Sequence, residues 1–244
     1  MMRLASSISN KNAKTENRMS LFFLAVQATY TSLEVGIYRD QQQLAIKQLE
    51  KTSSNLLIDT IAALLKQQNL SLINLAFIAV NRGPAPFTSL RVALATVNGI
   101  AFSSGIKLVG VDGLRTFAQA ESAPDFPPTA FLLNAFNNDV YYAVKLPNTE
   151  LEIGCAPIDD VLSQISKKDA HHWRFMGNGA ILFKEKIDSL FKKSTIETEP
   201  IYPSLLSVAH AAFSSWQKKA LIIDRALPLY LKETHYKKSA LNHN

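Results

Sequence analysis

The chain has 244 residues, 47% of them hydrophobic, a single cysteine and a formal net charge of +6. This length and composition can bury a large core, which excludes an intrinsically disordered chain. The lone Cys155 excludes an internal disulfide, and we expect it to be a small core or strand residue. No apolar run approaches the roughly 18 residues of a membrane helix, so we expect a soluble, cytoplasmic protein with no membrane partner.

Residues 1–18 differ in composition from the rest of the chain, because they are rich in Ser, Asn and Lys and contain no hydrophobic run. We expect a disordered N-terminal extension here. Two alternatives stay open: Met19 is the biological start, or the segment is a transit peptide. The transit peptide is the weaker alternative, because such peptides are rich in arginine and this segment has only Arg3 and Arg18.

Hydrophobic periodicity predicts two successive α/β units. For the first unit, we expect strands at 21–27, 32–38 and 42–46, a helix at 54–69, a strand at 75–80, a helix at 86–103 and a strand at 106–111. For the rest, we expect a connecting helix at 113–120, strands at 129–134, 139–146 and 172–176, and helices at 158–167, 179–192 and 204–217. Leu33, Val35 and Ile37 alternate with less apolar neighbours, which predicts a hairpin strand with one solvated face.

Pro124, Pro127 and Pro128 mark the point where the chain enters its second half. We therefore divide the chain into four parts. They are a disordered extension over 1–18, a first lobe over 19–115, a second lobe over 116–226 and a C-terminal tail over 227–244.

The helix predicted over 86–103 carries little charge, since Arg91 is the one charged residue between Phe87 and Ser103. Its core face is formed by Phe87, Leu90, Ala93, Leu94, Val97, Ile100 and Ala101. The core face of the helix at 54–69 is formed by Leu57, Ile58, Ile61, Ala62, Leu64 and Leu65. Because the helix over 86–103 carries so little charge, we expect it to be covered on two sides.

Both helices carry a second stripe of mostly small or weakly polar residues, which lets another helix backbone approach closely. This predicted partner interface consists of Leu56, Thr60, Ala63, Gln67, Thr88, Val92, Ala95, Thr96, Gly99 and Phe102. Two interpretations stay open: the stripe is buried under another part of the same chain, or it is a subunit interface.

A search for catalytic and metal-binding patterns returns none. The five histidines are His171, His172, His210, His235 and His243. None of them has the i, i+4 spacing that places two imidazoles on one helical face. The sequence also lacks a serine-hydrolase elbow and a phosphate-binding loop. We expect His210 to be partly buried or capping, and Gly177-Asn178-Gly179 to be a turn.

The segment VNRGPAPFTSLRVALATVNGIAFSSGIKLVGVDGL, which begins at Val80, resembles the signature Gly-Arg-Gly-Pro-Gly-Ser-Phe-Thr-Gly-Leu-Arg and following helix of the TsaB (YeaZ) family. Weaker matches follow the family's order from about Ser20 to Lys232. That family supplies a non-catalytic subunit of the bacterial machinery that makes threonylcarbamoyladenosine in transfer RNA. The resemblance implies an α/β, two-lobed actin-like (ASKHA, ribonuclease-H-like) fold with duplicated mixed-sheet lobes.

The sequence departs from the family pattern at positions where relatives carry functional groups. The usual Ile-Asp-Thr-Ser is replaced by VQAT at 26–29, and Gln27 cannot supply an anionic metal ligand. The usual Asp-Ala-Arg is replaced by NAF at 134–136, which removes a charged pair. Two signature glycines are Ala85 and Ser89, which makes close approach of a phosphate less favourable. We therefore expect no catalytic, cofactor or metal site.

The resemblance implies a pseudoenzyme that binds a TsaD-type catalytic subunit as a heterodimer, with a TsaE-type ATPase in the larger complex and a homodimer when alone. Transfer RNA would be met indirectly, helped by basic pairs such as Lys167-Lys168 and Lys218-Lys219. The alternative is an active ATP-dependent transferase or glycoprotease-like enzyme of the same fold. Gln27 argues against it, and so does the absence from 54–69 of the His-x-x-x-His pair of metal-binding relatives.

Overall fold

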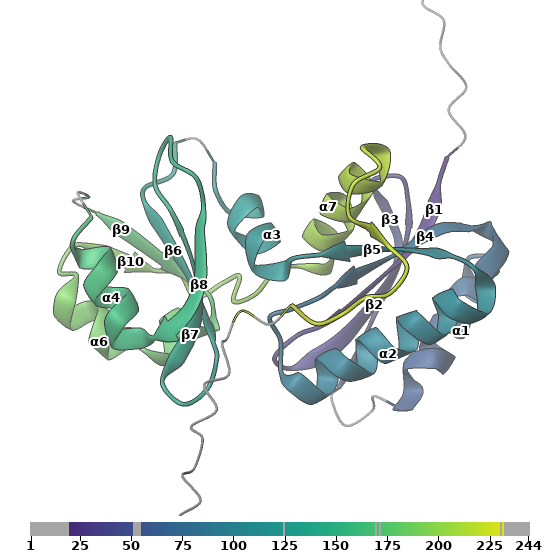
Figure 1. Cartoon of the computed structure of the whole chain (residues 1–244), viewed down its shortest axis with the longest axis horizontal. Helices are drawn as coiled ribbons and strands as arrows, with labels where there is room; N and C mark the ends of the chain where they lie inside the picture. Colours follow the sequence, from purple (N-terminus) through teal and green to yellow (C-terminus); the bar gives the residue numbers. More distant parts are fainter. Residues whose placement is uncertain are drawn as a thin grey trace, which may run out of the picture.

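The computed structural model describes residues 20–50, 55–123, 125–168, 170, 172–229 and 231. These residues form two α/β lobes that lie side by side along the long axis of the molecule (Figure 1). The expected extension over 1–18 and three histidines, His171, His235 and His243, lie outside the described residues. Within the described ranges, no helix has the length and apolar character needed to cross a membrane.

The first lobe is built on one mixed sheet. Its chain order is β1 (Phe22–Ala28), β2 (Ser32–Arg39), β3 (Gln42–Glu50), α1 (Leu57–Gln67), the 3-10 helix η2 (Leu72–Asn74), β4 (Leu75–Asn81), α2 (Phe87–Ser104) and β5 (Lys107–Val111). The first three strands form an antiparallel meander, β4 runs parallel to β1, and β5 runs parallel to β4. The order of strands and helices predicted for this lobe is confirmed.

The second lobe repeats the same strand arrangement. Its chain order is β6 (Thr129–Asn134), β7 (Asp139–Lys145), β8 (Glu152–Pro157), α4 (Ile158–Ser166), β9 (Trp173–Met176), α5 (Asn178–Leu182), α6 (Lys184–Leu190) and β10 (Ser194–Ile196). The spatial order β10-β9-β6-β7-β8 corresponds to β5-β4-β1-β2-β3, with the same strand directions. This duplication confirms the predicted two-lobed actin-like fold.

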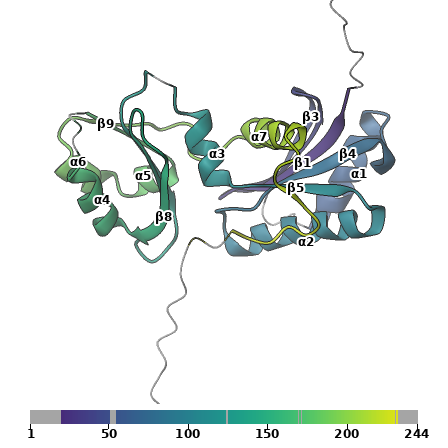
Figure 2. The same ribbon diagram turned by 45° about the horizontal axis from the view of Figure 1, so that its top comes forward.

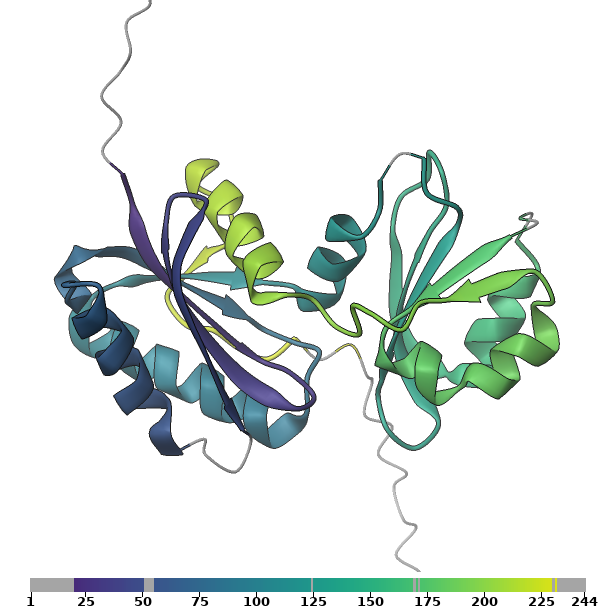
Figure 3. The same cartoon turned by 180° about the vertical axis from the view of Figure 1, so that it is seen from behind.

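Two helices each pack on a different lobe from the one that precedes them in the chain. Helix α3 (Gly113–Ala120) follows β5, yet Leu114 and Phe117 pack against Phe131 of the second sheet. Helix α7 (Leu205–Gln217) follows β10, yet it packs on the first sheet, with Trp216 stacked on Phe77. In Figures 1 and 3, α3 lies between the two lobes and α7 lies next to it, over the first sheet.

The predicted second lobe over 116–226 is therefore wrong for its last part. Besides α7, strand β11 (Ile222–Ile223) pairs antiparallel with β5 and so extends the first sheet. The boundary was misplaced because sequence order does not reveal which sheet a helix covers. Of the predicted tail over 227–244, Leu229 also lies against the first lobe, since its N–H donates to the Arg82 carbonyl at 2.9 Å.

The first sheet is covered on both faces, as Figure 2 shows, with α1 and α2 on one side and α7 on the other. The predicted solvated face of β2 is therefore wrong. Glu34 is 9% exposed and Tyr38 is fully buried, because α7 covers the face that the alternation assigned to solvent. The same burial raises the pKa of the Tyr38 hydroxyl above its usual range.

Local details of the second lobe differ from the sequence prediction. Strands β8 and β10 were not predicted, and the single helix expected over 179–192 is divided into α5 and α6 at Phe183. Cys155 lies in β8 and is half-buried, so its prediction as a strand residue is confirmed. Gly177 has φ of +97° and forms the predicted turn, which begins α5 one residue earlier than expected.

Candidate functional site

The signature segment joins β4 to α2 through a loop that several distant segments hold in place. Gly83 has φ of +116°, a conformation that favours glycine. Its N–H donates to the Asn81 Oδ1 at 2.9 Å, and its carbonyl accepts from the Gly113 N–H at 2.8 Å. The loop is thereby fixed to the start of α3, the helix that leads into the second lobe.

Gln27, at the position where relatives carry a carboxylate, has protein partners for its whole amide group. It is fully buried, and its Nε2 donates to the Glu34 Oε2 at 2.7 Å and to the Pro203 carbonyl at 3.1 Å. Its Oε1 accepts from the Asn81 Nδ2 at 3.2 Å. The buried network Glu34–Gln27–Asn81 thus occupies the end of β1 and links it to the signature loop.

Glu34 is the ionisable member of this network, and the sequence analysis did not single it out. Burial raises the pKa of its carboxyl above the ordinary 4.5, and the hydrogen bond from Gln27 offsets only part of that rise. A raised pKa means that the folded state holds the proton more tightly than the unfolded state. The corresponding contribution to stability is fully present below about pH 4.5 and is lost as the pH rises through the folded-state pKa.

We expect Glu34→Gln to become progressively more stable relative to the unmodified protein as the pH rises from below 4.5 to neutral, because a buried amide does not ionise. Gln27 can still donate to the new side-chain oxygen. Urea unfolding across this pH range measures the difference in free energy of unfolding. Glu50→Gln, at the exposed end of β3, is the matched control. Parallel pH curves for the two variants would contradict the assignment.

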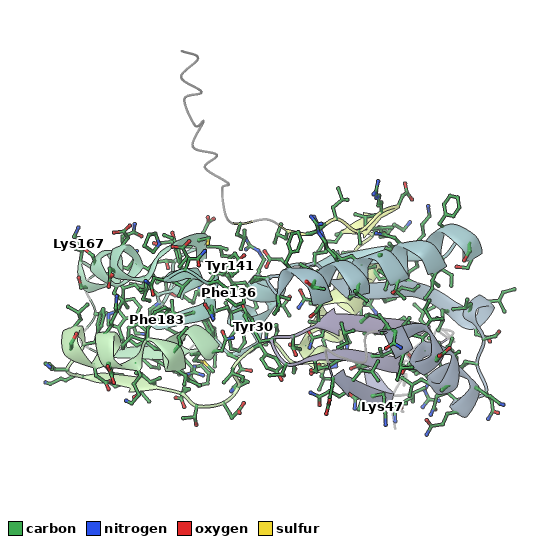
Figure 4. The ribbon with its side chains drawn as sticks, turned by 90° about the horizontal axis from the view of Figure 1, so that it is seen from below. Tyr30, Lys47, Phe136, Tyr141, Lys167 and Phe183 are labelled. Carbon is green, nitrogen blue, oxygen red and sulfur yellow. The ribbon has the colours of Figure 1, made fainter. Side chains whose placement is uncertain are left out.

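A second polar cluster joins the two lobes. The Tyr30 hydroxyl, in the turn between β1 and β2, donates to the Asn134 carbonyl at the end of β6 at 2.7 Å. Asn178 from the glycine turn accepts from the Asn134 N–H at 3.0 Å. Burial raises the pKa of Tyr30 far above its usual range, so its hydroxyl remains a donor. In Figure 4, Tyr30, Tyr141 and Phe136 lie close together where the lobes meet.

Phe136 and His210, two positions that the sequence analysis considered for a charged or catalytic group, are both exposed. Phe136, which stands where relatives have arginine, is 54% exposed. His210 on α7 is exposed, and its Nε2 donates to the Gln41 carbonyl, in the turn between β2 and β3, at 3.0 Å, so its prediction as partly buried or capping is wrong. Among the described residues, no group of three or more His, Cys, Asp or Glu side chains could hold a metal ion.

The core face predicted for α2 is confirmed at Leu90, Ala93, Leu94, Val97 and Ala101, which are all buried. It is wrong at Phe87, the first residue of the helix, which is 56% exposed. The centroid of the Phe87 ring lies 3.7 Å from the Arg91 guanidinium carbon. For α1, the prediction is wrong at Ile58 and Ala62, which are exposed. Helix α1 buries a narrower stripe than expected, because it packs mainly on β2 and β3 near the sheet edge.

None of the ten residues of the predicted interface is buried by the described part of the chain. Leu56, Ala63, Gln67, Thr88, Ala95, Gly99 and Phe102 are exposed, and Thr60, Val92 and Thr96 are partly buried. Phe102 is 94% exposed, and a Cβ added at Gly99 would meet no atom within 4 Å. We call these ten residues the α1–α2 face. The interpretation that the chain buries this face itself is therefore not supported by the described residues.

Two sheets with the same strand order, together with α3 and α7, which each pack on the lobe that does not precede them in the chain, define a two-lobed α/β protein of the actin-like class. A family model described as "TsaD: tRNA N6-adenosine threonylcarbamoyltransferase" matches residues 47–238. The chain is 22% identical over 216 residues to the tRNA threonylcarbamoyladenosine biosynthesis protein TsaB of Buchnera aphidicola, a match that covers 84% of this chain and 99% of that protein.

Two further comparisons agree. The solved structure of YeaZ from Pseudomonas aeruginosa shares the fold, with a TM-score of 0.65, 20% identity, and coverage of 86% of this chain and all of that one. A tRNA N6-adenosine threonylcarbamoyltransferase of Syntrophus aciditrophicus is 32% identical over 89 residues, which are 35% of this chain and 26% of that enzyme. The chain belongs to the TsaD family and, within it, to the TsaB (YeaZ) group.

Proposed function

We propose that this chain is a non-catalytic subunit for threonylcarbamoyladenosine formation in transfer RNA, and that it binds a TsaD-type catalytic paralogue as a heterodimer. A TsaE-type ATPase joins the larger complex, and the same face supports a homodimer when the partner is absent. In this account, the chain activates its partner by stabilising the partner's working conformation. Relatives with the TsaB name are called tRNA threonylcarbamoyladenosine biosynthesis proteins, which supports the pathway assignment.

The exposure of the α1–α2 face is the observation that carries the proposal. Large apolar side chains on this face are open to solvent, since Phe102 near the end of α2 is 94% exposed and Leu56 at the start of α1 is 44% exposed. Ile58, in the first turn of α1, is 62% exposed. Exposed large apolar side chains on two neighbouring helices favour a protein interaction site. The small residues Ala63, Ala95 and Gly99 between them allow a helix of the partner to approach closely.

The polar network around Gln27 supports a non-catalytic role. An amide replaces the carboxylate, and both its N–H groups and its carbonyl are occupied by Glu34, Pro203 and Asn81. The nearby Glu34 carboxyl has a raised pKa and is engaged with that amide, so it is a poor ligand for Mg²⁺. No observation among the described residues favours the alternative of an active enzyme.

Deleting the gene for this chain should remove threonylcarbamoyladenosine from the transfer RNAs that read codons beginning with adenine. The expected loss follows because the partner is active only while it is bound. Mass spectrometry of nucleosides from digested transfer RNA measures the effect, and restoring the gene on a plasmid is the control. Normal modification in the deletion strain, with no second copy of the gene, would refute the assignment.

A further inference from the structure

Three hollows follow one another along α3, on residues that the α1–α2 face does not use. The first, of about 480 Å³, is lined by Arg82, Arg115 and Lys218 among others. The second, of about 520 Å³, shares Arg115 with the first and adds Lys145. The third, of about 310 Å³, shares Lys145 with the second and reaches Phe126. We call this continuous depression the α3 groove.

The charged side chains of the α3 groove are four cations and two carboxylates. Among the residues that line it, the carboxylates are Asp112 and Glu150. Asp112 caps α3 by accepting from the Arg115 N–H at 3.0 Å, and its second oxygen lies 4.0 Å from the Arg115 Nε. Arg82 and Lys145 donate to backbone carbonyls, of Leu227 and Thr149, which orient the two cations without neutralising them. The groove therefore keeps a net positive potential.

Two other features of the α3 groove point to a ligand. Among the side chains of the described residues, the Ser122 Oγ is the one buried polar atom without a hydrogen-bond partner, and Ser122 lines both the second and the third hollow. A bound ligand or an ordered water can supply the missing partner. At the end of the groove, Phe126 is 42% exposed, and its ring lies 4.6 Å from the Arg174 guanidinium carbon. Arg174 is half-buried and its Nε also lies 3.4 Å from the Glu197 Oε1, so it holds the Phe126 ring in a position where its exposed part can stack a planar base.

We propose that the α3 groove binds a single-stranded segment of RNA, with backbone phosphates along Arg82, Arg115, Lys145 and Lys218 and a base stacked on Phe126. Three hollows in series suit an extended chain of phosphates better than a single small anion. A basic groove that ends at an aromatic ring is the usual design for single-stranded nucleic acid. The inference deepens the proposed function, because it gives this chain a direct contact with the RNA that the complex modifies.

The test is fluorescence anisotropy of a labelled single-stranded RNA oligonucleotide and of an unmodified transfer RNA transcript with the full-length protein. Arg115→Gln/Lys145→Gln should weaken binding and reduce the slope of log affinity against log salt by about 1.4, since each lost phosphate contact to a single strand removes about 0.7. Phe126→Leu should weaken binding about 10-fold with an unchanged salt slope, because stacking involves no counterion release.

The matched control is Lys47→Gln/Lys184→Gln, which removes two charges at exposed positions outside the α3 groove, one in each lobe; Lys47 is labelled in Figure 4. It should leave both affinity and salt slope nearly unchanged. An equal loss in the control, or competition by polyglutamate as effective as competition by RNA, would overturn the inference. Capture of the TsaD-type partner is measured on the same variants. RNA binding that follows the groove residues in a protein that captures no partner would uphold this inference and refute the proposed function.

Discussion

Gly99→Arg should abolish binding of the TsaD-type partner while leaving the isolated protein folded. The new side chain has room in the monomer, because a Cβ at Gly99 meets no atom within 4 Å, and arginine favours a helix interior over glycine by about 1 kcal/mol. At a packed interface, an unpaired charge costs about 2–5 kcal/mol, which corresponds to roughly 30-fold to several thousand-fold in affinity. Ala95→Arg, one turn earlier on the same face, should act in the same way.

Pull-down with the partner and thermal melting by circular dichroism are the two measurements. Gly99→Ala adds only a methyl group, so this variant should still bind the partner. Ser163→Arg adds the same charge at an exposed position of α4 in the other lobe and should bind normally. If Gly99→Arg binds as well as these controls, the interface lies elsewhere. If it unfolds, the face belongs to the folded core.

Phe77→Ala should destabilise the folded protein by about 3–5 kcal/mol, the usual cost of truncating a buried aromatic side chain. Phe77 is fully buried, with its ring centroid 4.5 Å from that of Phe23 and 4.7 Å from that of Trp216. Because Trp216 comes from α7, the substitution tests whether that distant helix stabilises the first lobe. Urea unfolding followed by Trp fluorescence measures the change.

Phe102→Ala is the matched control, since it makes the same chemical change at a side chain that is 94% exposed. Its stability should change by no more than about 0.5 kcal/mol. A small effect of Phe77→Ala, similar to that of the control, would mean that α7 does not pack on β4 as described.

The first lobe could be predicted well from sequence because its signals are local. The apolar run of β1, the alternation along β2, the helical period of α2 and the glycine turn at Gly83 each depend on neighbours in the chain. The second lobe was harder, because β8 contains Gly154, Cys155 and Ala156, which have little strand preference, and β10 has only three residues. The position of α7 depends on contacts with strands more than a hundred residues away, which periodicity does not encode.

The same limit explains the errors at the candidate site. The loss of the carboxylate at Gln27 was visible in the sequence, whereas its partner Glu34 was assigned to a solvated face. The hairpin register pairs Gln27 with Glu34, so a register count across the Ala28–Ser32 turn could have brought them together. Burial of Glu34 could not be found in this way, because it requires α7. By contrast, exposure of the α1–α2 face follows from the arrangement of the described residues, none of which buries the stripe.

Complementation of a deletion strain tests the central claim most directly, namely that transfer RNA modification depends on the α1–α2 face. Threonylcarbamoyladenosine is quantified by mass spectrometry in strains that express the unmodified chain, Gly99→Arg or Ser163→Arg at equal protein levels. We expect the unmodified chain and Ser163→Arg to restore the modification and Gly99→Arg to leave it absent. Full restoration by Gly99→Arg would contradict the account.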